Sequence, residues 1–211
     1  MEPNGSTDAS YGKPQRSFRL DRETQRGRLI DGMAWTVARR GYAATPVAEV
    51  LRAAGVSRRT FYEQFADKED CFLAAYDAFV ALSTERLVAG YHAGSSWEDG
   101  IASAYDGLLH ALAAEPDLAH LGVVGVLGAG PRALARREAT LRRFARFIDH
   151  TRERAEIAAT PPPRVGQAIV GGIHELVYSQ IVCGETEQLP RLTDELRHYT
   201  FMLLGVARPV G

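Results

Sequence analysis

The sequence predicts an all-α fold, and three observations support this class. After residue 20, apolar residues recur three and four positions apart, which is the spacing of one buried helix face. No convincing run of alternating apolar and polar residues, typical of a half-buried strand, interrupts this pattern. Proline and glycine separate the periodic segments at positions that suit helix starts and stops. We therefore expect an N-terminal unit of three helices followed by a larger C-terminal helical bundle.

The individual helices can be placed from their caps and apolar periods. The first is expected around residues 30–37, and two short helices follow, with Thr45 and Ser57 as their N-caps. Asp67 caps a long fourth helix that reaches about residue 91. The remaining helices are expected at about residues 96–114, 117–127, 131–158, 165–183 and 189–205.

Composition excludes several classes of protein. The 211 residues are 45% hydrophobic and 24% charged, which is typical of a globular chain with a packed core. No apolar stretch is long enough to span a membrane, and the polar N-terminus does not resemble a secretory signal. Cys71 and Cys183 lie far apart, which argues against a disulfide scaffold or a zinc finger. We expect a cytoplasmic chain without metal, cofactor or membrane partner.

The near-zero net charge hides an uneven distribution. Between residues 13 and 59 there are eleven Lys and Arg side chains and four acids, whereas the rest of the chain is acidic. A basic front on an acidic body favours contact between one end of the molecule and a polyanion. A cluster of solvated arginines is the alternative interpretation.

Residues 45–70, TPVAEVLRAAGVSRRTFYEQFADKED, have the pattern of a helix-turn-helix motif. Two short capped helices flank a turn that contains Gly55, and the second helix of such a motif enters the DNA major groove. Phe61 and Phe65, one turn apart, are expected to face the core. At 100° per residue, Arg59 and Glu63 then point away from it. A helical hairpin with a solvated polar face is the alternative interpretation.

The side chains on this exposed face are suited to DNA. Arginine can pair with guanine O6 and N7, and Glu63 can accept from cytosine N4. Hydroxyl, amide and ammonium groups can bind phosphate oxygens, as can the free N–H groups at helix N-termini. The expected DNA-binding residues are Thr45, Ser57, Arg58, Arg59, Thr60, Tyr62, Glu63, Gln64 and Lys68.

The same string resembles the signature of the TetR family of bacterial transcriptional regulators. Its signature positions are occupied by Thr45, Val47, Val50, Ala54, Gly55, Val56, Ser57, Thr60, Phe61, Tyr62, Phe65, Lys68 and Glu69. Cys71 and Phe72 depart slightly from the small or apolar residues, often leucine, that usually follow. The resemblance covers about residues 22–70 and implies a body that binds a small ligand and dimerises through its last two helices. It assigns DNA-backbone contacts to Thr45, Ser57, Thr60, Tyr62 and Lys68, and base readout to Arg58 and Arg59.

These observations together predict three regions: a flexible basic arm at 1–20, a helix-turn-helix domain at 21–67, and an effector-binding and dimerisation domain at 68–211. The expected function is a ligand-responsive repressor that binds a palindromic operator in double-stranded DNA as a homodimer. A helical enzyme, or an interaction module that does not bind DNA, is the alternative. Lys13, Arg16 and Arg19 of the arm either follow DNA phosphates or belong to a solubilising tail.

The predicted body has candidate residues for a ligand and for a second copy of the chain. Polar and aromatic groups on otherwise apolar helices are candidates for lining a small-molecule effector site: Tyr76, Trp97, Tyr105, His110, His120, His174 and Tyr178. Excess apolar surface on the last two helices predicts dimer contacts from Ile169, Ile173, Leu176, Leu192, Leu196, Tyr199 and Leu203. Gly171 and Gly172 are consistent with close approach of a partner backbone. Alternatively, both helices only complete the core of a single chain.

Two short strings resemble enzyme motifs, but each lacks a feature that its motif requires. Residues 128–133, GAGPRA, fit a dinucleotide-binding fingerprint, but no second strand is available to form the parallel sheet that it requires. His174 and Glu175 begin an HExxH-like string, but Tyr178 stands where the second histidine is needed. We therefore expect a chain that is not an enzyme.

Overall fold

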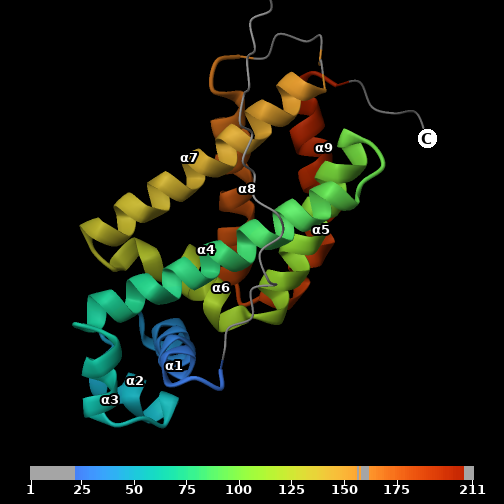
Figure 1. Cartoon of the computed structure of the whole chain (residues 1–211). Helices are drawn as coiled ribbons and strands as arrows, with labels where there is room; N and C mark the ends of the chain where they lie inside the picture. Colours follow the sequence, from blue (N-terminus) through green and yellow to red (C-terminus); the bar gives the residue numbers. More distant parts are fainter. Residues whose placement is uncertain (1–21, 156, 158–161, 207–211) are drawn as a thin grey trace, which may run out of the picture.

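The computed structural model describes residues 22–155, 157 and 162–206, and all regular elements within these ranges are helical (Figure 1). The α-helices are α1 (Gln25–Arg40), α2 (Val47–Ala54), α3 (Arg58–Gln64), α4 (Lys68–Ala93), α5 (Trp97–Ala114), α6 (Pro116–Val123), α7 (Pro131–Arg154), α8 (Val165–Val182) and α9 (Thr193–Leu204). Two 3₁₀ helices, η1 (Gly125–Gly128) and η2 (Thr186–Leu192), lie between them. The all-α class predicted from the sequence is confirmed.

Helices α1, α2 and α3 form a small unit at the lower end of the molecule in Figure 1. Thr24 caps α1 by accepting from the Gly27 N–H, and Ser57 caps α3 by accepting from the Thr60 N–H. Gly55 ends α2 in the left-handed conformation that glycine adopts without a steric cost. The core of the unit is apolar and consists of Leu29, Met33, Val37, Val50, Ala54, Phe61 and Phe65.

Helix α4 extends this unit into the body. Asp67 caps it by accepting from the Asp70 N–H, and the helix then continues without interruption for 26 residues. Its first turns belong to the core of the N-terminal unit, since Cys71 and Phe72 are buried and the Phe72 ring meets Tyr42 edge-on at 5.0 Å. Its later turns pack along α5, as Figure 1 shows.

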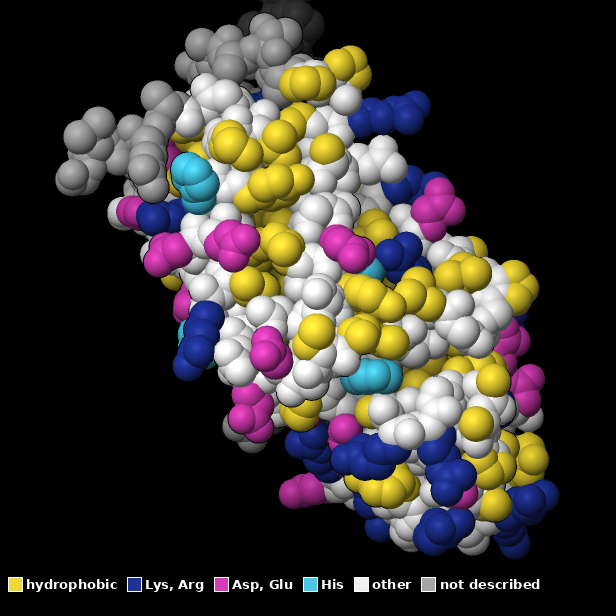
Figure 2. Space-filling view, turned by 180° about the vertical axis from the view of Figure 1, so that it is seen from behind, with side chains coloured by type: hydrophobic (Ala, Val, Ile, Leu, Met, Phe, Trp, Pro, Cys, Tyr) yellow, Lys and Arg dark blue, Asp and Glu magenta, His cyan; other side chains and the backbone are white. Residues whose placement is uncertain are grey.

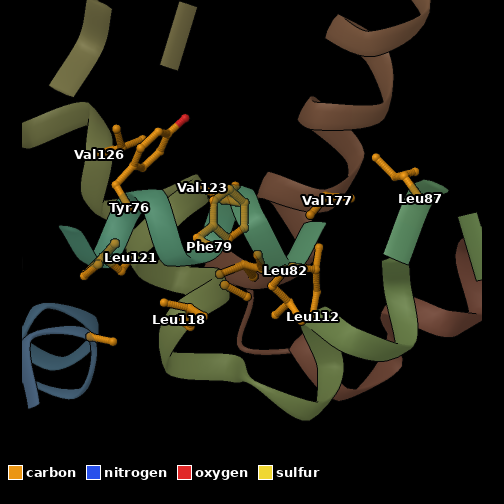
Figure 3. Close-up of a cluster of buried hydrophobic side chains, with 14 of the residues drawn as sticks. Tyr76, Phe79, Leu82, Leu87, Leu112, Leu118, Leu121, Val123, Val126 and Val177 are labelled. Atoms are coloured by element: carbon orange, nitrogen blue, oxygen red, sulfur yellow. The ribbon is translucent and has the colours of Figure 1, made fainter. Parts of the chain in front are cut away.

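The body core lies where α4, α5, α6 and α8 meet. Figure 3 shows Leu82 of α4 beside Leu112 of α5, and Phe79 of α4 and Leu121 of α6 belong to the same apolar cluster. At Gly122, α6 and α4 are so close that a Cβ atom would lie 2.2 Å from the Phe79 ring. Glycine therefore permits this crossing of α6 and α4.

Two helices differ from the sequence-based prediction in their extent. The segment expected at 117–127 is α6 followed by η1. At Gly125, the first residue of η1, a Cβ atom would lie 2.7 Å from the Val37 side chain, so the close packing there requires glycine. The last helix starts at Thr193 rather than near residue 189, with η2 before it. Pro190 lies within η2.

The structure also bears on the two competing motifs and on membrane association. Residues 128–133 form the end of η1, a turn and the start of α7, and no strand is present in the described part of the chain for a nucleotide-binding sheet. Among the described residues, no group of three or more His, Cys, Asp or Glu side chains is arranged to hold a metal ion. None of the helices described is both long and apolar enough to cross a membrane.

Candidate DNA-binding surface

Helix α3 presents a polar face to solvent because its aromatic residues anchor the opposite face. Phe61 is fully buried and Phe65, directly after the helix, is almost so. Arg58, Arg59 and Glu63 are exposed on the other side. This is the orientation that the sequence predicts.

Two of the outward side chains form an ion pair in the free protein. The Arg59 Nε lies 2.8 Å from the Glu63 Oε1, one helical turn away, and the Arg59 side chain is 89% exposed. An exposed pair at this spacing contributes only about 0.3–0.5 kcal/mol. Arg59 can therefore leave Glu63 for a better acceptor at little cost. Arg58 has no hydrogen bond or ion pair to the part of the chain that the structure describes, so its five donors are available.

The remaining residues expected on α3 lie beside this face. Tyr62 is 53% exposed and its ring meets Phe61 edge-on at 5.2 Å, which leaves its hydroxyl at the surface. Thr60 and Gln64 are half-buried. The Thr60 hydroxyl lies 2.9 Å from the Ser57 hydroxyl, so both belong to the N-terminal cap of α3.

The structure corrects the prediction for Thr45. Pro46, not Thr45, is the N-cap of α2, and no side chain caps this helix. Thr45 is buried, and its hydroxyl donates to the Gly41 carbonyl at 2.8 Å. Thr45 closes the turn between α1 and α2, and its hydroxyl is not presented to a phosphate in this conformation.

Lys68 holds the same turn from the other side. Its ammonium donates to the carbonyls of Tyr42 and Thr45, both at 3.1 Å, and lies 4.2 Å from the Tyr42 ring centroid. An ammonium has three donors, so one remains for a phosphate oxygen. Lys68 thus positions the start of α2 in the free protein, a role that sequence reasoning missed.

Arg26 is a second residue that the sequence analysis missed. It lies on α1, donates to the Gln64 carbonyl at 2.9 Å, and stacks over the Phe65 ring at 4.3 Å. It therefore supplies the positive charge at the C-terminus of α3 that the helix itself lacks. An arginine 38 residues earlier gives no local signal of this contact.

The basic front of the sequence is partly neutralised by the fold. Arg22 pairs with Glu115 at 2.6 Å and Arg39 with Asp117 at 2.9 Å, which joins α1 to the start of α6. Arg40 pairs with Glu49 at 2.8 Å within the small unit. Figure 2 nevertheless shows Lys and Arg side chains concentrated at the end formed by α1–α3, while acidic groups are spread over the body. The basic residues expected in the arm, Lys13, Arg16 and Arg19, lie outside the described residues.

The comparisons with known proteins agree with this geometry. Residues 33–75 match the family model described as bacterial regulatory proteins, tetR family. The match covers 43 of the 211 residues and includes the helix-turn-helix of α2 and α3.

Similarity also comes from solved structures and from a curated relative. The chain superimposes on the fatty acid degradation regulator FadR from Bacillus halodurans with a TM-score of 0.75 and 19% identity, covering 87% of this chain and 96% of that one. For FadR from Bacillus subtilis, solved in complex with stearoyl-CoA, the TM-score is 0.70 at 17% identity, covering 85% and 98%. At such identities the likeness concerns the fold alone.

The curated relative is the HTH-type transcriptional activator FasR from Mycolicibacterium smegmatis. It is 33% identical over 79 residues, which is 37% of this chain and 34% of FasR, so the match spans about a third of that relative. FadR and FasR are both named as transcriptional regulators.

The seven candidates for ligand contact do not form one cluster. His174 lies beside Arg137, with 3.5 Å between the Arg137 Nη2 and its ring nitrogens, whereas the buried Tyr76 has Thr140 as the hydrogen-bond partner of its hydroxyl. Trp97 and Tyr105 instead contact α9: the Trp97 ring meets Phe201 at 5.3 Å. The Tyr105 hydroxyl lies 2.8 Å from that of Thr200, with both residues buried.

The other three candidates differ in exposure. The side chain of His110 is 62% exposed and pairs with Asp106, so it does not line an interior site. His120 is half-buried, its Nδ1 has no partner among the described residues, and burial lowers its pKa despite the nearby Asp117. Tyr178 is half-buried against the core.

The residues expected at the dimer interface separate into two groups. Ile169, Leu192 and Leu196 are buried in the core of the single chain, so they do not form an outer surface. Ile173, Leu176, Tyr199 and Leu203 are half-buried. Gly172 is explained within the chain, because a Cβ there would lie 2.6 Å from the Tyr199 hydroxyl, whereas Gly171 faces open space. The apolar residues expected at the dimer interface therefore pack largely inside one protomer.

Proposed function

We propose that this TetR-family chain is a sequence-specific DNA-binding repressor that acts as a homodimer and responds to a small ligand. The observation that carries the DNA-binding part is the outward face of α3, where Arg58, Arg59 and Glu63 are exposed opposite buried Phe61. An α-helix fits into the major groove of DNA, where arginine and carboxylate side chains can distinguish guanine and cytosine edges.

Within this proposal, side chains divide by the part of DNA that they contact. Arg58, Arg59 and Glu63 read base edges. Tyr62, Gln64, Thr60 and the third donor of Lys68 bind phosphates next to the groove, together with the N–H groups of the Ser57-capped helix end. Thr45 acts indirectly, by closing the α1–α2 turn that Lys68 also binds.

A dimer is proposed because one short helix reads only a few base pairs. A two-fold protein doubles the site by placing two such helices in half-sites roughly 34–36 Å apart, or a multiple of this distance. The surface that we propose for the contact is the outer side of α8 and α9. It includes the exposed Val182 and Met202 and the half-buried Leu176 and Leu203.

Ligand control is proposed from the architecture and from a structural neighbour. FadR from Bacillus subtilis was solved with stearoyl-CoA, which supports a fatty-acyl compound as the effector of this chain. Such a ligand changes DNA affinity only if it binds the DNA-competent and the DNA-free conformations with different affinity. We propose that the ligand favours the DNA-free conformation. Because FasR is named a transcriptional activator, activation is the competing outcome that the experiment must test.

The decisive experiment is selection of duplex DNA from a random pool by the full chain. We expect enrichment of an inverted repeat, followed by binding that weakens steeply with added salt, because phosphate contacts release counterions. Sedimentation of the complex should give two chains per duplex. Adding an acyl-CoA should lower the affinity. Failure to enrich any sequence would contradict the proposal, and a ligand-induced rise in affinity would contradict repression.

A further inference from the structure

Helix α3 is too short to keep its orientation without outside contacts. It has seven residues, and isolated helices shorter than about 12–15 residues are marginal in water. Ser57 caps its N-terminal end. At the other end the last turn has no basic residue, and Phe65 is extended rather than in the left-handed conformation that often closes a helix. The last carbonyls of α3 therefore need partners from other elements.

Arg26 of α1 binds this end of α3 at two neighbouring residues. Its Nη1 donates to the Gln64 carbonyl at 2.9 Å, and its guanidinium lies over the Phe65 ring, 4.3 Å from the centroid. A hydrogen bond alone would let the helix end turn about the bond axis, whereas the second contact on the adjacent ring restrains that rotation. A bond from a charged donor is also roughly twice as strong as a neutral one. Arg26 thus restrains both the position and the orientation of this end.

The turn after α3 is held from the side of α4 as well. The Ala66 N–H donates to the Asp70 Oδ2 at 3.1 Å, and the Asp70 N–H donates to the Asp67 side chain at 2.8 Å. These contacts bind the turn to the next helix along the chain. Arg26 instead joins it to a helix 38 residues earlier, so its hydrogen bond is a direct polar link between α3 and α1.

A small error at this end matters because of the side chains that it carries. Glu63 and Gln64 lie in the last turn of α3. The helix is about 10 Å long, so a tilt of about 5° around its capped end moves the other end by about 0.9 Å. Side chains that recognise a ligand must be held to within about 0.5 Å. The loss of one contact at the C-terminal end is therefore enough to misplace Glu63 against a base edge.

We propose that Arg26 is a positioning residue for base readout. It binds no base, and it holds the C-terminal end of α3 at the angle at which Arg59 and Glu63 meet the base edges. The inference rests on the proposed DNA binding and adds to it a residue of α1. Because Arg26 is exposed, a direct contact to a DNA phosphate is the competing role. The two roles predict different measurements.

Amide hydrogen exchange tests the positioning role without DNA. The Phe65 N–H donates to the Phe61 carbonyl at 2.8 Å and reports on the end of α3. In full-length Arg26→Gln this amide should exchange at least about tenfold faster than in the wild type, because the helix end opens locally. The Val56 N–H, which donates to the Leu51 carbonyl after α2, is the internal control and should change by less than about twofold.

Anisotropy titrations on the selected duplex and on a shuffled duplex test the consequence for readout. Arg26→Gln should lower the ratio of the two affinities by at least about fivefold and leave the salt dependence of binding unchanged. Arg26→Lys keeps the charge and one donor, so it should bring the ratio back to within about twofold of the wild type. Arg28→Gln removes the same charge from an exposed position of the same helix and should leave the ratio unchanged.

The outcomes separate this inference from its competitors and from the proposed function. Equal acceleration of the Phe65 and Val56 amides would mean general destabilisation and would overturn the inference, as would no acceleration at Phe65. An unchanged affinity ratio with a salt slope lower by about one would make Arg26 a phosphate contact and also overturn it. Local acceleration at Phe65 in a chain that enriches no duplex would support the positioning of α3 and overturn only the proposed function.

Discussion

Replacing Arg59 tests whether α3 reads bases. Arg59→Ala removes the Glu63 ion pair, which is worth about 0.3–0.5 kcal/mol in the free protein, and any contact to a base edge. A bidentate contact to guanine contributes about 1–3 kcal/mol. Because wild-type Arg59 must first leave Glu63, the net loss should be about 0.5–2.7 kcal/mol, or about 2- to 100-fold in affinity.

The measurement is fluorescence anisotropy on the selected duplex and on a shuffled duplex of the same length. We expect the loss on the selected duplex, and much less on the shuffled one. Glu63→Gln removes a negative charge from the same face and should strengthen binding to the shuffled duplex, while Arg143→Ala on α7 should change neither affinity. An equal loss by Arg59→Ala on both duplexes would refute the assignment of base readout to this residue.

Three further predictions follow from burial and pairing. The Met202 side chain is 59% exposed in one protomer, so Met202→Glu should yield folded monomers in sedimentation. Leu196→Glu buries a charge and should unfold the chain. A folded dimer of Met202→Glu would place the interface elsewhere. Tyr105→Phe should lower the free energy of unfolding by about 1–2 kcal/mol because Thr200 loses its partner, and adding Thr200→Val should restore most of it in urea melts; no restoration would contradict this pairing. In the folded chain the pKa of His174 is lowered from 6.5 to about 4, so the unfolded chain binds more protons between these pH values. Stability should therefore fall as the pH drops from about 6.5 to about 4. His174→Gln should flatten this dependence in thermal melts, and an unchanged slope would contradict the prediction.

Local patterns in the sequence predicted the local structure of the recognition unit. Ser57 was expected as a cap, and Phe61 and Phe65 as the buried side of α3, because caps and helical periods depend on residues a few positions apart. The contacts of Lys68 and Arg26 were missed, because they join residues 23 to 38 positions apart through backbone carbonyls that have no side-chain signature.

The dimer residues show a different limit of sequence analysis. A three-four spacing of leucines around Leu196 indicates a helix that packs against another helix, but it does not distinguish a partner protomer from the same chain. In this fold α9 begins at Thr193, after Pro190 of η2. Leu192 and Leu196 complete the core of one protomer. Likewise, the seven ligand candidates were chosen by residue type, and only the fold showed that His174 lies beside Arg137 while Trp97 and Tyr105 contact α9.

The uninterrupted length of α4 gives it the mechanical properties of a lever. Its 26 residues span about 39 Å, and its first turn is fixed to the recognition unit by the contacts of Lys68 and Phe72. A rotation of about 6° around its far end would displace that unit by about 4 Å. This is about a third of the roughly 12 Å width of the major groove, whereas side chains that read base edges tolerate errors of only about 0.5 Å. A small tilt imposed on α4 in the body is therefore enough to take α3 out of register with DNA.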